Sequence, residues 1–146
     1  MARKVVSILA GAGLFIALVG ISVGFLARSG ITPIGRFIQS AFREGSAEGF
    51  GRFVASDEGF ALLSRGVRFM KLVILPVISI AAGFFTGWVS KNKAWLCSIV
   101  AVGPVAILTV GYSSLTSVLS VAICILFAAI SGYVANVLLP AEPLRA

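Results

Sequence analysis

Very few side chains in this sequence could carry out acid–base, nucleophilic or metal chemistry. The 146 residues include no histidine, which excludes haem or zinc held by histidine and Ser-His nucleophilic catalysis. The two cysteines, Cys97 and Cys124, lie inside apolar runs and form no CxxC pair, so they indicate small buried side chains rather than redox chemistry. We therefore predict no catalytic residue, no metal site, no cofactor and no enzymatic activity.

The carboxylates are equally uninformative as chemical groups, because all five lie outside the long apolar runs: Glu44, Glu48, Asp57, Glu58 and Glu142. Asp57 and Glu58 are neighbours, so on a helix they project about 100° apart and cannot converge well on one ion. With Ser56 before them they are better interpreted as a helix start, since a capping hydroxyl and acidic residues suit that position. A proton-coupled transporter usually needs an ionisable group inside the membrane, so that function is disfavoured.

The helices of this chain are indicated by long runs of sequence that contain no charged residue. Val5–Ala27 and Leu72–Ser90 contain no charged residue, and neither does the longer run Ala94–Ala141. A hydrocarbon core about 30 Å thick needs about 20 apolar residues per spanning helix. The first two runs therefore fit one crossing each, and the third fits two. Apolar residues make up 59% of the chain, well above the roughly 45–50% that is usual in soluble domains.

These runs predict an all-α integral membrane protein that forms a single membrane domain over residues 1–146. We expect four transmembrane helices, over residues 5–27, 72–90, 95–111 and 118–139. The polar string Tyr112–Ser117 supplies the turn that divides the third run. Gly103-Pro104 is expected to kink the third helix, and Pro140 and Pro143 to close the fourth.

An amphipathic segment over residues 28–71 separates the first two spans. It holds seven basic and four acidic residues, for a local net charge of +3. Thr32 and Pro33 form a sound helix start, because a capping residue is followed by a first-turn proline. Apolar residues then follow at helical spacing up to Phe42, and Gly45 can end this helix. A second helix is predicted from Ser56 and can run without a break into the second span.

The segment is interpreted as a surface that contacts lipid or a partner protein. Aromatic residues and arginines both occur throughout it, as in helices that lie on a membrane. The residues predicted to make these contacts are Arg36, Phe37, Phe42, Arg43, Arg52, Phe53, Phe60, Arg65 and Arg68.

Two GxxxG motifs are candidates for helix packing: Gly20 with Gly24 in the first span, and Gly83 with Gly87 in the second, where Ser79 adds a turn. Small residues four apart form a groove that lets a second helix approach closely. The sequence leaves open whether each groove receives a helix of this chain or of another subunit. In the fourth span Gly132 and Asn136 share a stripe that favours packing over the lining of a pore.

The net charge of +7 favours anionic lipid head groups as partners. We predict no nucleic-acid partner, because no basic cluster is separable from a span. Arg3 and Lys4 before the first span, judged with the third and fourth spans, favour a cytoplasmic N-terminus and C-terminus. We expect a bacterial-type inner (cytoplasmic) membrane.

Two functions compete on this sequence. The first is a non-catalytic accessory or structural subunit that packs against a larger membrane protein complex. It is favoured by the two GxxxG motifs, by the amphipathic segment over residues 28–71, and by the lack of any catalytic or metal-binding motif in the sequence. The alternative is a small channel or transporter subunit that acts as a homo-oligomer, because four short helices rarely enclose a path alone.

Overall fold

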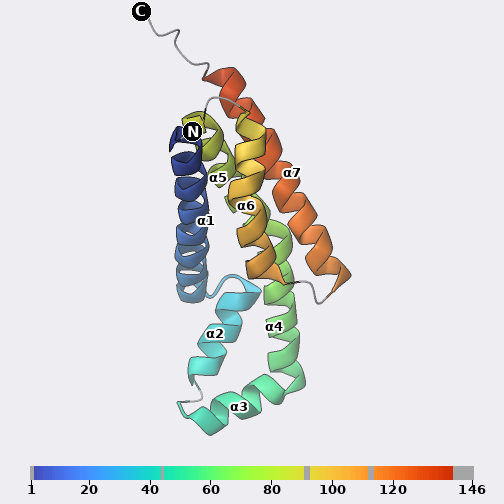
Figure 1. Cartoon of the computed structure of the whole chain (residues 1–146). Coiled ribbons are helices and arrows are strands. Elements are labelled where there is room, and N and C mark those ends of the chain that lie inside the picture. The colour runs from blue at the N-terminus through green and yellow to red at the C-terminus, as the bar shows by residue number, and fades with distance from the viewer. Residues whose placement is uncertain (1, 44, 91–92, 112–113, 140–146) are drawn as a thin grey trace, which may run out of the picture. The chain divides into compact units, whose positions relative to one another are not determined.

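Every element in the described part of the chain is a helix, which confirms the predicted all-α class. The structure is a computed structural model and describes residues 2–43, 45–90, 93–111 and 114–139. The elements, shown in Figure 1, are α1 (Ala2–Ser29), α2 (Pro33–Arg43), α3 (Ala47–Ala55), α4 (Asp57–Phe69), the π-helical turn η1 (Met70–Ile74), α5 (Leu75–Ser90), α6 (Ala94–Val110) and α7 (Leu115–Leu138).

Three helical stretches are long and apolar enough to cross a membrane: Arg3–Ser29, Asp57–Ser90 and Leu115–Leu138. The first two contain the predicted first and second spans, and the third covers the predicted fourth span up to Leu138. The helix at the predicted third span, α6, is also apolar but has only 17 residues. The structure thus presents three candidate spans and one shorter apolar helix.

The chain divides into two compact units. The first unit contains Met1–Val19 and Leu75–Ala146, and the second contains Gly20–Ile74. In the first unit α5, α6 and α7 pack side by side (Figure 1). The beginning of α1 lies against α5 and α6. The contact is so close at Gly11 that a Cβ atom there would collide with the Thr86 side chain of α5 and crowd Ala101 of α6.

Small residues form the core of the first unit. Ala82, Ala101, Ala106, Ala128 and Ala135 are buried, and so are several serines and threonines. The buried hydroxyls mostly donate to carbonyls of their own helix. Ser79 Oγ donates to Leu75 O at 2.8 Å and Thr86 Oγ1 to Ala82 O at 2.7 Å. This satisfies polar groups without water, as a helix in lipid requires.

In the second unit the segment between the first two predicted spans folds into three helices that pack on one another. As predicted, α2 begins at Pro33, and the Gly35 N–H donates to Thr32 Oγ1 at 3.2 Å. Also as predicted, α4 begins after Ser56, whose Oγ accepts the Gly59 N–H at 3.1 Å.

Helix α3 is not among the sequence predictions. Ser46 caps it by accepting the Gly49 N–H at 3.0 Å, and Glu48 lies in its first turn. Two glycines within its nine residues lower its helix propensity and interrupt the spacing of its apolar residues. The remaining sequence signals for a helix were the capping Ser46 and the acidic Glu48.

The junction between α4 and α5 contains the π turn Met70–Ile74, with Pro76 just beyond it. Proline has no N–H to donate to the carbonyl of Leu72, four residues earlier, and its ring crowds that carbonyl. A wider turn is one way that a helix accommodates this. α6 continues through Pro104 without interruption, and the expected kink there stays a prediction. The predicted roles of Tyr112, Ser113, Pro140 and Pro143 concern residues outside the described part of the chain.

Candidate functional site

The GxxxG motif of α5 is filled by helices of the same chain. Gly83 and Gly87 are buried, and a Cβ atom at either position would collide with the backbone of α7, at Ala128 and Gly132 respectively. Ser79 is buried one turn earlier. The three residues therefore form an internal packing seam, which includes Gly132 of the predicted fourth-span stripe.

A hydrogen bond between helices strengthens this seam. Ser98 Oγ of α6 lies 2.8 Å from Gly83 O of α5 and 2.9 Å from Ala94 O of its own helix. A Cβ atom at Gly132 would collide with the Ser98 side chain, so α6 and α7 are also in close contact. Asn136, the other residue predicted on this stripe, is half-buried in α7.

The GxxxG motif of α1, in contrast, is open. Gly20 and Gly24 are exposed, and a Cβ atom built on either meets nothing within 4 Å. Ile21 and Phe25 are 66% and 71% exposed beside them. Ile21, Gly24, Phe25 and Arg28 line an open hollow of about 350 Å³, here called the Gly24 hollow.

The part of α1 in the first unit also has one packed side and one open side. Ser7, Gly11 and Phe15 are spaced four residues apart and are buried. Gly13 and Ala17 are exposed, and a Cβ atom at Gly13 would meet nothing within 4 Å. In the most apolar 18 residues of each candidate span, the share of buried residues is 17% for α1, 44% for Asp57–Ser90 and 39% for α7. Of the three candidate spans, α1 therefore has the most surface left for other contacts.

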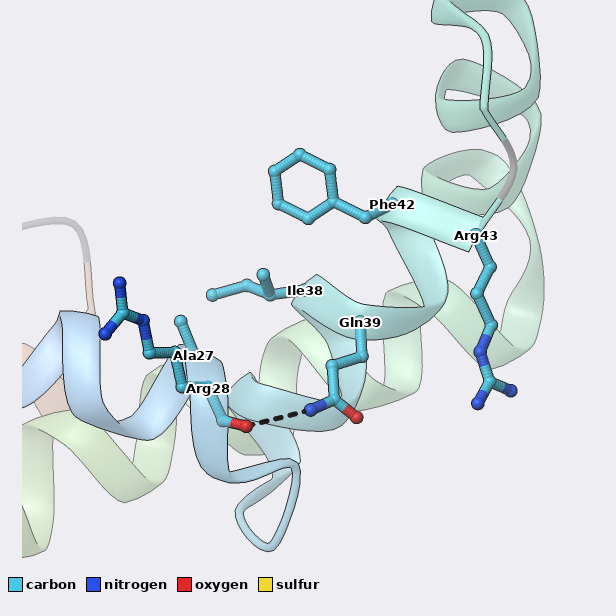
Figure 2. Close-up of a pocket in the computed structure, with 6 residues that line it drawn as sticks. All are labelled: Ala27, Arg28, Ile38, Gln39, Phe42 and Arg43. Atoms are coloured by element: carbon cyan, nitrogen blue, oxygen red, sulfur yellow. Dashed lines mark hydrogen bonds between the residues drawn. The ribbon is translucent and has the colours of Figure 1, made fainter.

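A second hollow lies at the corner between α1 and α2. The chain turns through Gly30, whose φ of +60° suits glycine, and Gly35 comes so close to the Leu26 carbonyl that a side chain would not fit. Gln39 Nε2 donates to Arg28 O at 3.1 Å across the corner (Figure 2). These contacts fix the start of α2 against the end of α1.

The corner hollow has a volume of about 460 Å³ and is open to the surroundings. Figure 2 shows Ile38 and Phe42 extending from α2 on one side, while the Arg43 side chain extends away from them. The residues that line this corner hollow are Ala27, Arg28, Ile38, Gln39, Phe42 and Arg43. Its described lining combines two basic side chains with an apolar wall and includes no carboxylate.

Not all the predicted contact residues of the loop are available to lipid or a partner. Phe37 of α2 and Phe53 of α3 face each other, with ring centroids 5.7 Å apart, and both are half-buried. Ile34 packs on Gly66 of α4. The side chains that do remain exposed are Arg36, Phe42, Arg43, Arg52, Phe60, Arg65 and Arg68.

Sequence reasoning did not select Arg28, Ile38 or Gln39 as site residues. A signal was present, because Arg28 directly follows an uncharged run and Ile38 lies four residues before Phe42. The turn at Gly30 that brings the two helices together is a tertiary feature. Pattern alone does not specify it.

Among the described residues, no three Cys, Asp or Glu side chains come together to hold a metal ion. Cys97 and Cys124 are buried as free thiols. Comparisons with protein-family models, curated proteins and solved structures give no match.

Proposed function

We propose that the protein is a non-catalytic, four-span membrane protein that acts as an accessory subunit of a larger membrane protein complex. The observation that carries the proposal is the contrast between the two GxxxG motifs. The chain fills the motif of α5 with its own α7 and leaves the motif of α1 open. Because helices in lipid associate mainly through close packing at small residues, an open groove on a spanning helix favours docking of a helix from another subunit.

The proposal counts α6, the short helix at the predicted third span, as a crossing in addition to the three longer candidate spans. Its 17 residues correspond to about 26 Å of helix, at the short end of what a bilayer core accepts. Two observations support a crossing: α6 carries no charge, and it packs against both α5 and α7 through Ser98, which contacts Gly83 and Gly132. Four crossings put both chain ends on the same side, and the basic residues beside the first span favour the cytoplasmic side of an inner-type membrane.

Mild-detergent extraction from the native membrane, followed by native mass measurement of whatever carries this chain, tests the accessory role. We expect stoichiometric co-migration with larger, different subunits. The double variant Gly20→Leu/Gly24→Leu should insert normally but lose this co-migration, because two isobutyl groups fill the groove. Val23→Ile, a conservative change of a half-buried residue in the same turn of the helix, is the control and should behave as wild type.

Two outcomes oppose the proposal. A closed ring made of this chain alone would favour the homo-oligomeric channel or transporter instead. A complex that survives the Gly20/Gly24 double substitution intact would show that docking does not use this groove.

A further inference from the structure

We propose that the corner hollow between α1 and α2 binds an anionic phospholipid, with Arg28 holding the phosphate and Ile38 and Phe42 holding the start of an acyl chain. This inference rests on the proposed role of α1 as a membrane span and names one lipid class and one place for it. Its evidence lies within the second unit.

The charge of the hollow favours an anion. Arg28 and Arg43 both line it, and none of the described residues that line it is a carboxylate. Guanidinium groups bind phosphate with two hydrogen bonds in a plane, which makes arginine a preferred phosphate ligand. Gln39 Nε2 donates to the backbone carbonyl of Arg28 and holds that residue at the corner, and the Arg28 guanidinium is the cationic group available to an anion. Arg43, whose side chain extends another way in Figure 2, adds a second positive charge at the edge.

The walls of the hollow favour an amphiphile over a free ion. Phe42 is 81% exposed, and it shares the hollow with Ile38 and Ala27. Figure 2 shows Ile38 and Phe42 extending to the same side of α2. An inorganic anion would leave this apolar surface uncovered, whereas an acyl chain would cover it and gain free energy from its burial.

The position of Arg28 selects a lipid as the source of the phosphate. Arg28 is the first charged residue after the uncharged run Val5–Ala27, so on a spanning α1 it lies where the hydrocarbon ends. Lipid phosphates occupy that level of the bilayer. A hollow that is basic at its edge and apolar inside therefore matches a phospholipid in both chemistry and depth.

Native mass measurement of lipid adducts on the purified full-length chain tests this proposal. The probes are phosphatidylglycerol, phosphatidylcholine with the same acyl chains, and inorganic phosphate. We expect phosphatidylglycerol to bind preferentially. Arg28→Gln/Arg43→Gln should weaken that binding by about fivefold for each charge removed, the effect of one basic residue near an anionic surface.

Arg3→Gln/Lys93→Gln is the matched control, because it removes the same charge from exposed basic residues outside the hollow and outside the predicted contact residues of the loop. It should change phosphatidylglycerol binding less than twofold, because neither residue lines the hollow. Equal losses in the two double variants would overturn the proposal, since diffuse attraction would then explain the binding. Helical content by circular dichroism establishes that each variant is folded.

Two phenylalanines separate a lipid from a free anion. Phe42→Ala should weaken phosphatidylglycerol binding several-fold, and Phe50→Ala, which truncates an exposed ring on α3 that does not line the hollow, should not. Inorganic phosphate that competes fully with the lipid would overturn the lipid assignment in favour of a free-anion site. The assay uses the isolated chain, so its result is independent of whether larger subunits co-migrate with the protein.

Discussion

At the scale of single residues, glycine and serine determine which helices come into contact. Gly83, Gly87 and Gly132 let α5 and α7 approach to backbone contact, and Ser98 fills the remaining space from α6. Larger residues at these points would separate the helices and lose the dispersion contacts that hold them together in lipid. A Cβ atom at Gly20 or Gly24, in contrast, would meet nothing within 4 Å in the described part of the chain.

This difference gives a prediction at two matched pairs of glycines. Gly83→Leu/Gly87→Leu should destabilise the protein by about 1–3 kcal/mol, because the added atoms would collide with the backbone of α7 at Ala128 and Gly132. Gly20→Leu/Gly24→Leu should leave the stability of the isolated chain unchanged or slightly raised, because leucine favours helix more than glycine does. Unfolding in detergent micelles measures both, and equal destabilisation by the two pairs would contradict the packing described here.

At the scale of elements, the helix starts of the second unit follow from local chemistry. Thr32-Pro33 and Ser56-Asp57 have cap and first-turn residues that predict α2 and α4 from sequence alone. The helix α3 escaped prediction because its glycines dilute the pattern, and the π turn before Pro76 escaped because it depends on how the helix accommodates a missing N–H.

The loop also shows where periodicity stops being informative. Spacing correctly groups Ile34, Phe37, Ile38 and Phe42 on one apolar side of α2. It does not divide that side into Phe37, which packs on Phe53, and Phe42, which stays exposed. Likewise, two GxxxG motifs look alike in sequence although only that of α5 meets another helix. Which surface is covered depends on tertiary contacts that no local pattern contains.

Ser56 provides the test at this scale, because its side chain joins two elements. Its Oγ accepts the Gly59 N–H of α4 and donates to Phe53 O of α3 at 2.6 Å. Ser56→Ala should cost about 1 kcal/mol, the usual value for a lost cap. Ser64→Ala, whose hydroxyl bonds only to Ala61 O within α4, is the control. Limited proteolysis of the loop should accelerate for Ser56→Ala alone; equal rates for the two variants would show that the cap contributes little.

At the scale of the whole molecule, the number of crossings determines which loops share a side of the membrane. With four spans, positions 46 and 114 lie on one side and position 93 on the other. If α6 did not cross, positions 93 and 114 would lie together, opposite 46. This comparison does not depend on which side is cytoplasmic.

Single cysteines test this arrangement in a chain without its two buried native thiols. We expect Ser46→Cys and Ser114→Cys to react alike with a membrane-impermeant maleimide on sealed vesicles, and Lys93→Cys to behave oppositely. All three positions are exposed in the structure, so each should react once the vesicles are permeabilised. Opposite behaviour of positions 46 and 114 would rule out four spans.

The central claim is that the open groove of α1 receives a helix of a different membrane protein, and cross-linking from inside that groove tests it most directly. A photoreactive side chain at position 21, between Gly20 and Gly24, should form one discrete, stoichiometric adduct with another integral membrane protein in the native membrane. The same probe in the Gly20→Leu/Gly24→Leu background should form none. Adducts with lipid alone, or only with a second copy of this chain, would contradict the accessory role.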